Sequence, residues 1–113
     1  MFTVVETSAF SKHCLDYWTE NERQGFAAWL AAHPDAGDVV PGTGGCRKIR
    51  WARSGSGKRG GVRVIYYNRL PSGVIYLLLI YAKSASDNIP AHVLLKIKEA
   101  INADDRKEIA GPR

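Results

Sequence analysis

The chain has 113 residues, 45% of them apolar and 24% charged, and a net charge of +5, which together predict one soluble globular domain with a modest core. Its longest apolar run has nine residues, far short of the ~20 that a membrane-spanning helix needs, and its first residues lack the pattern of a signal peptide. The two cysteines and three histidines are scattered and match no metal-ligand spacing, so we expect a cytoplasmic protein with reduced thiols, no metal and no cofactor.

The N-terminal third is predicted to form a strand and two helices. Residues 2–6, "FTVVE", have the pattern of a short strand. A set of apolar residues then recurs at the spacing of one helix face: Phe10, Cys14, Tyr17 and Trp18. Thr19 and Glu22 have the spacing of a capping box and predict the start of a second helix. The apolar stripe of that helix contains Phe26, Trp29, Leu30 and His33.

The rest of the chain is predicted to contain a loop, three strands and a third helix. Proline and glycine are dense in residues 33–45, which predicts the loop. Strand-like runs follow at Cys46–Ala52, Val62–Tyr67 and Val74–Ala82. Asp87 or Asn88 can cap the third helix, which has Pro90 in its first turn and an apolar side made of Val93, Leu94, Ile97 and Ile101. We expect the order β-α-α-β-β-β-α in a single domain of residues 1–102, followed by a flexible tail at 103–113.

Positive charge is concentrated in the middle of the chain. Residues 39–86 contain nine basic and no acidic residues and carry +9, whereas the other residues, with seven basic and eleven acidic, carry −4. A solvated surface normally mixes the two signs, so this interval predicts a polyanionic partner, although a merely basic sheet is an alternative. Strand alternation places Lys48, Arg50 and Arg63 together on an exposed face.

One glycine-rich motif in this interval points to a different partner. "GSGKRG", residues 55–60, has the spacing G-x-G-x-x-G of a dinucleotide-binding turn. Such a turn must lead into a helix, whose N-terminus binds the pyrophosphate, but here a strand pattern follows. A P-loop also fails, because Ala52 stands where its first glycine belongs and Arg59 follows Lys58. We interpret the segment as a basic connection between strands.

The residue types of the basic interval suit metal-free cleavage of RNA. A 2′-OH can attack the adjacent phosphate if a protein aligns the nucleotide and neutralises the charge that builds on the phosphate oxygens. Arg63 suits this role, because a guanidinium meets two phosphate oxygens and stays protonated. The interval lacks the usual His or Glu acid–base pair, so Lys48 is the candidate base, provided that Arg50 and Arg63 lower its pKa. Exposed tyrosines are candidates for stacking on bases.

The segments "GTGGCRKIRWARSGSGKRGGVRVIYY" and "YLLLIYAK" resemble the RelE/ParE superfamily of toxins, and most of all its HigB-type members. The resemblance implies an α+β fold with a mostly antiparallel four-stranded sheet, two N-terminal helices and a C-terminal helix. It implies an endoribonuclease (mRNA interferase) that cuts mRNA in the ribosomal A site and so inhibits translation. It also implies a cognate antitoxin, often a helix-turn-helix protein, through which the complex binds operator DNA.

The resemblance assigns catalytic roles to four residues: Lys48, Arg50, Arg63 and Lys83. The sequence departs from RelE in having Ser84 where RelE has an arginine, and in lacking a tyrosine early in its C-terminal segment. Lys58, Arg59 and Tyr81 are candidates to supply what is missing. The full set of expected RNA or ribosome contacts is Arg47, Arg53, Lys58, Arg59, Tyr67 and Tyr81.

Some of these residues also fit purely structural roles, and two other functions of the protein stay open. Arg47, Arg53 and Arg69 are typical of solvated or backbone-contacting charges. Tyr66 and Tyr76 are typical of core aromatics. Trp18, Phe26 and Trp29 belong to packing or to a patch covered by the antitoxin. The alternative functions are a ParE-like inhibitor of a DNA topoisomerase, which cuts nothing itself, and a non-catalytic nucleic-acid-binding module.

Overall fold

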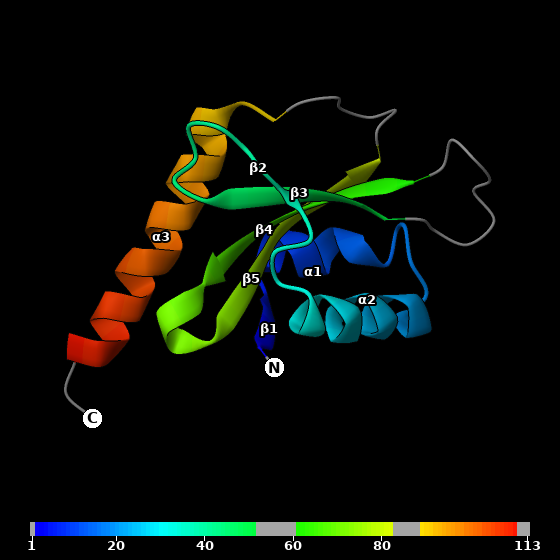
Figure 1. The fold of residues 1–113 in the computed structure, drawn as a ribbon, viewed down its shortest axis with the longest axis horizontal. Helices are drawn as coiled ribbons and strands as arrows, with labels where there is room; N and C mark the ends of the chain where they lie inside the picture. The colour runs from blue at the N-terminus through cyan, green and yellow to red at the C-terminus, as the bar shows by residue number, and fades with distance from the viewer. Residues whose placement is uncertain (1, 52–60, 83–88, 111–113) are drawn as a thin grey trace.

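The structure is a computed structural model that describes residues 2–51, 61–82 and 89–110 (Figure 1). Its elements, in chain order, are β1 (Thr3–Glu6), α1 (Ser8–Cys14), α2 (Glu20–Ala32), β2 (Asp38–Val39), β3 (Cys46–Trp51), β4 (Val62–Arg69), a 3-10 turn (Leu70–Ser72), β5 (Val74–Ala82) and α3 (Ala91–Ala110). The predicted α+β class and element order are confirmed, apart from the added β2.

The five strands form one sheet in the order β1-β5-β4-β3-β2. β1 pairs with β5 in parallel, and every other neighbouring pair is antiparallel. The prediction of four strands is therefore corrected to five. The additional strand, β2, has only two residues and lies within the Pro- and Gly-rich segment that was expected to be a loop. It exists because Asp38 and Val39 pair with β3.

The two N-terminal helices begin at hydrogen-bonded caps. Thr7 caps α1 by accepting from the Phe10 N–H at 3.2 Å. α2 has the predicted capping box: the Thr19 hydroxyl accepts from the Glu22 N–H at 3.2 Å, and the Glu22 carboxylate accepts from the Thr19 N–H at 2.8 Å. α1 ends at Cys14, earlier than its apolar stripe suggested. Trp18 is buried all the same, because the turn after α1 folds it into the core.

Helices cover both faces of the sheet. α1 and α2 lie on one face, where the first cluster of buried residues includes Phe10, Phe26, Leu30, Val64 and Tyr66. α3 lies on the other face at one end of the sheet (Figure 1), and its Leu94, Ile97 and Ile101 pack in the second cluster. That cluster also contains Cys46, Ile65, Leu78 and Tyr81. β5 contributes to both clusters, as expected of a strand covered on both sides.

α3 begins at Ala91 and extends further toward the C-terminus than predicted. The predicted caps Asp87 and Asn88 lie outside the described residues, and the Pro90 carbonyl accepts the first bonds from the N–H groups of Val93 and Leu94 at 3.0 and 3.4 Å. The helix backbone continues to Ala110, through most of the segment expected to be a tail. In the part of the chain that the structure describes, no helix is both long and apolar enough to cross a membrane.

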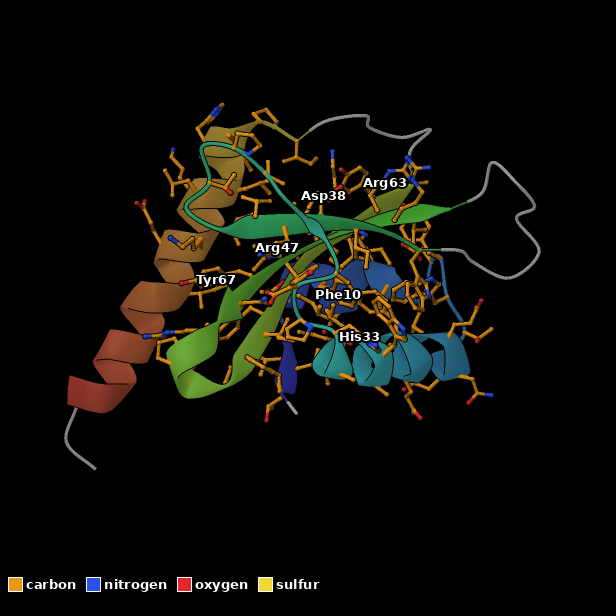
Figure 2. The ribbon with its side chains drawn as sticks, viewed as in Figure 1. Phe10, His33, Asp38, Arg47, Arg63 and Tyr67 are labelled. Atoms are coloured by element: carbon orange, nitrogen blue, oxygen red, sulfur yellow. The ribbon has the colours of Figure 1, made fainter. Side chains whose placement is uncertain are left out.

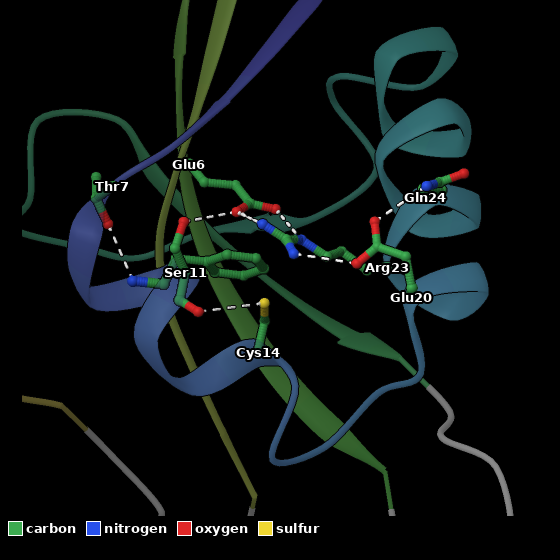
Figure 3. A network of polar contacts seen from close by, with 8 residues as sticks. Glu6, Thr7, Ser11, Cys14, Glu20, Arg23 and Gln24 are labelled. Atoms are coloured by element: carbon green, nitrogen blue, oxygen red, sulfur yellow. Dashed lines mark hydrogen bonds and ion pairs between the residues drawn. The ribbon is translucent and has the colours of Figure 1, made fainter.

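A polar network ties β1 to both N-terminal helices (Figure 3). The Glu6 carboxylate accepts from the Arg23 Nε–H at 2.7 Å, from Arg23 Nη2 and from the Ser11 hydroxyl at 2.6 Å. Arg23 Nη1 also donates to Glu20 at 3.2 Å. These bonds hold the pKa of Glu6 below its ordinary value even though burial opposes them. Glu6 and Arg23 therefore stay charged and join three elements at neutral pH.

Candidate nucleic-acid interface

Three of the predicted site residues come together on one face of the sheet. β3 and β4 pair so that Arg50 lies directly opposite Arg63, and Lys48 lies opposite Ile65. Residues two apart on a strand share a face, so Lys48, Arg50 and Arg63 form one group, which we call the basic cluster. Figure 2 shows Arg63 on the opposite side of the sheet from Phe10, toward the end away from α3. The predicted sharing of a face is confirmed.

The basic cluster places like charges side by side. Like charges directly opposite each other on neighbouring strands destabilise a sheet. Among the described residues, no carboxylate forms an ion pair with Lys48, Arg50 or Arg63. An anion bound between the two arginines would relieve their repulsion.

Gly61 lies between the two arginine side chains. A Cβ built on Gly61 would be 3.8 Å from Arg50 Cγ and 3.9 Å from Arg63 Nη1. The same Cβ would be 3.3 Å from the Trp51 carbonyl oxygen, so a side chain has little room here. The glycine therefore lets both arginines lie close to the backbone at the end of the β3–β4 ladder.

The two tyrosines predicted to stack on bases lie on the same face but are engaged in packing. Tyr81 pairs with Arg63 in the β4–β5 register and is only 7% exposed. Tyr67 stacks on Tyr76, with ring centroids 6.5 Å apart, and Lys98 Nζ lies 5.2 Å from the centre of the Tyr67 ring. Figure 2 shows Tyr67 on the side of α3. Neither ring is openly displayed to solvent.

Arg47 lies on the opposite face from the basic cluster. It pairs with Tyr66 across β3 and β4. Its Nη1 donates to the Gly37 carbonyl at 2.7 Å and to the Asp35 carbonyl at 3.3 Å, and its Nη2 lies 3.6 Å from the Asp35 carboxylate. The guanidinium thus holds the segment that leads into β2. The other predicted residues Arg53, Lys58, Arg59 and Lys83 lie outside the described residues.

The structure adds one acidic residue to this face that the sequence did not indicate. Asp38 of β2 pairs directly with Lys48 of β3, so both side chains leave the sheet on the same side. Val40, two residues later, packs in the cluster beneath α3, which agrees with that orientation. Asp38 stands just before residues 39–86, which contain no acidic residue, and only the β2–β3 pairing brings it to the basic cluster. The β-branched pair Val39–Val40 was the one local signal for a strand here.

Both cysteines are buried free thiols. Burial raises the pKa of both Cys14 and Cys46. A raised pKa keeps a thiol protonated, and the thiolate is the reactive form. Within the described ranges, no three His, Cys, Asp or Glu side chains are grouped so that they could hold a metal ion.

Comparisons with known proteins support the fold. No protein-family model matches the chain. Among solved structures, the chain is similar to a double mutant of the E. coli toxin RelE in the free state, with a TM-score of 0.57. The two sequences are 17% identical, and the match covers 76% of this chain and 87% of the RelE chain. At this identity the similarity shows a shared fold: the chain has a RelE-like α+β fold.

Proposed function

We propose that this protein is the toxin of a type II toxin–antitoxin system, a HigB-type member of the RelE/ParE superfamily that cleaves mRNA in the ribosomal A site. The observation that carries the proposal is the basic cluster: a lysine and two opposed arginines, with no ion pair to a described carboxylate, on one face of a RelE-like sheet. A polyanion is the partner that such a surface fits. Cleavage of that polyanion in the A site would stop translation.

The proposed reaction needs only groups of the protein and the RNA. The 2′-oxygen bonds to the adjacent phosphorus while the bond from phosphorus to the 5′-oxygen breaks, giving a cyclic phosphate and a free 5′-hydroxyl. Arg63 and Arg50 bind the phosphate oxygens and neutralise the charge that develops there. Lys83 is proposed as a further cation of the site. The tyrosines contribute to base stacking only if the ribosome complex changes their packing.

The partners follow from the same proposal. The toxin acts in the cytoplasm on ribosomes that carry mRNA, and a helix-turn-helix antitoxin encoded beside it inhibits it. Operator DNA is bound through the antitoxin. RNA contacts from Arg47, Arg53, Lys58 and Arg59 remain predictions, and Arg47 would have to act from the other face of the sheet.

The decisive experiment is to map mRNA ends in a reconstituted translation reaction. Wild-type protein should cut the message at ribosome-occupied codons, and Arg63→Ala should reduce the cleavage rate by about 10²–10³-fold, as is typical when one stabilising donor is removed from a transition state. Arg69→Ala is the matched control, since it removes the same charge from the other end of β4. It should cleave at a rate close to that of the wild type.

The alternatives predict other outcomes of the same reaction. If translation stops while the message stays intact, the protein blocks without cutting and the enzymatic proposal is wrong. If the message and translation are both unaffected but a DNA topoisomerase is inhibited, the ParE-like function applies. Binding of nucleic acid with none of these effects indicates a non-catalytic module.

A further inference from the structure

A charged residue next to the basic cluster has no role in the scheme above. Asp38 is exposed, and β2 presents it directly opposite Lys48. Among the described residues, none forms a hydrogen bond or ion pair with its carboxylate. The neighbouring Asp35 differs, because its carboxylate is contacted by Arg47 at 3.6 Å and by the Asn68 amide at 3.3 Å. Asp38 is thus a carboxylate with no evident structural task, placed opposite Lys48 on the face of the basic cluster.

The sheet geometry puts Asp38 and Arg63 two strands apart on the same face. Asp38 and Lys48 occupy one row across the strands, and Arg50 and Arg63 occupy the next row, two residues along. With strands ~4.8 Å apart and ~3.3 Å per residue, the Cα atoms of Asp38 and Arg63 are separated by about 12 Å. The side chains of both residues extend from the same face. A phosphate held by Arg63 and the adjacent 2′-OH near Asp38 therefore fit between them.

We propose that Asp38 is the general base of the RNA cleavage reaction, an inference that rests on the proposed function. Its carboxylate accepts the proton of the 2′-OH, the 2′-oxygen forms the bond to phosphorus, and the bond to the 5′-oxygen breaks. Lys48 then serves as a cation on the phosphate and as the donor that protonates the departing 5′-oxygen. This assignment replaces the expectation that Lys48 is the base, and it supplies the acid–base pair that residues 39–86 lack.

A buried anchor fixes the position of Asp38. The Gly37 N–H donates to the Tyr66 hydroxyl at 2.8 Å, and that hydroxyl donates to the Pro34 carbonyl at 2.9 Å. A Cβ on Gly37 would be only 2.9 Å from the Lys48 carbonyl oxygen. The backbone before Asp38 is therefore pressed against the backbone of Lys48, which keeps the two side chains in register.

The test is Asp38→Asn in single-turnover cleavage on programmed ribosomes. Loss of a general base should lower the cleavage rate by about 10²–10⁴-fold. Affinity for the ribosome should stay the same or rise, because a negative charge leaves a phosphate-binding face. Asp35→Asn is the matched control, with the same change of charge three residues earlier, and should cleave within threefold of wild type. Both variants should melt near the wild-type temperature.

A modified substrate separates a base from an acid. Sulfur in place of the bridging 5′-oxygen leaves without protonation, so it rescues the loss of an acid but not the loss of a base. Asp38→Asn should remain slow on this substrate, whereas Lys48→Met should recover much of its cleavage rate. Recovery of Asp38→Asn cleavage on the sulfur substrate would contradict the assignment, as would a cleavage rate of Asp38→Asn within threefold of wild type on the ordinary message.

The wild-type protein and Arg63→Ala separate a failure of the proposed function from a failure of the Asp38 assignment. If wild-type protein does not cut mRNA, the proposed function itself fails. If wild-type protein cuts and Arg63→Ala does not, only the role of Asp38 is at stake.

Discussion

Tyr66 shows how one buried side chain organises the edge of the sheet. Its ring belongs to the core beneath α1 and α2, while its hydroxyl reaches the loop between α2 and β2. Burial raises the pKa of this hydroxyl, so it remains a neutral group that both donates and accepts a hydrogen bond. The Asn68 amide donates to the same Pro34 carbonyl at 2.7 Å. Together these bonds hold the backbone that carries Asp38.

Tyr66→Phe should therefore destabilise the protein and loosen β2. The substitution keeps the ring but leaves the Gly37 N–H without its partner in the interior, which typically costs about 1–3 kcal/mol. Urea unfolding measures this loss, and hydrogen exchange of the Gly37 and Val40 amides measures the loosening. A free energy of unfolding equal to that of wild type would show that the hydroxyl does not anchor the loop.

A polar network holds β1, α1 and α2 together, as the Tyr66 hydroxyl holds the loop before β2. All three elements contribute side chains to this junction: Glu6, Ser11, Glu20 and Arg23. The side chain of Glu6 is only 18% exposed and that of Arg23 only 26%. The folded protein lowers the pKa of Glu6 because Arg23 and Ser11 bind the ionised carboxylate. By linkage, Glu6 contributes stability above its ordinary pKa of 4.5, and this contribution is lost as the pH falls through the lower value of the folded state.

Glu6→Gln should lower the free energy of unfolding at pH 7, and the difference from wild type should shrink as the pH falls below 4.5. Urea titrations at pH 7 test the loss of stability, and urea titrations below pH 4.5 test whether the difference from wild type shrinks. Glu99→Gln on the exposed side of α3 is the control and should track the wild type at every pH. A gap between Glu6→Gln and wild type that stays constant with pH would contradict the charged network.

Much of the element order was predictable because it depends on local sequence. The Thr19–Glu22 capping box and the apolar runs of β4 and β5 act over a few residues, and each lies where the sequence indicated. β2 was missed because a two-residue strand is defined by its partner, and its segment has the composition of a loop. α1 is shorter than predicted. Tyr17 and Trp18 lie in the turn after the helix, but their spacing from Phe10 and Cys14 is nearly that of a helix face, which is why the sequence indicated a longer helix.

The candidate site was predictable where strand alternation applies and not elsewhere. Lys48, Arg50 and Arg63 belong to regular strands, so their common face follows from the two-residue period. Asp38 required knowledge of the β2–β3 pairing, which joins residues ten positions apart across a glycine-rich turn. The packing of Tyr67 and Tyr81 depends on α3, whose docking position the sequence does not specify.

At the scale of the whole molecule, charge divides between the middle of the sequence and the remainder. The interval that builds β3, β4 and β5 has no acidic residue and carries +9, while the residues before and after it together carry −4. If the basic cluster binds a polyanion as proposed, this uneven charge should favour the encounter. Binding to single-stranded RNA should depend on salt accordingly.

The slope of log affinity against log salt should fall by about 0.7 for each cation of the basic cluster that is removed and that contacts a phosphate. Fluorescence anisotropy with a labelled RNA across a range of salt concentrations measures this slope for wild type, Arg50→Ala and Arg63→Ala. Lys96→Ala on α3 serves as the control with an unchanged slope. Equal slopes for all variants would place the RNA elsewhere on the surface.

The parallel pairing of β1 with β5 has a consequence for how the protein is made. β1 is the first strand to leave the ribosome, but its partner residues are 74–77, so about two thirds of the chain must be synthesised before the pair can form. Thr7 likewise waits for the carbonyl of Leu78, 71 residues away. The β3–β4 pair, which carries the arginines, can form earlier because its strands are close in sequence. β1 therefore can join the sheet only after β5 has been made, and a nascent chain that stops before β5 leaves β1 without its partner strand.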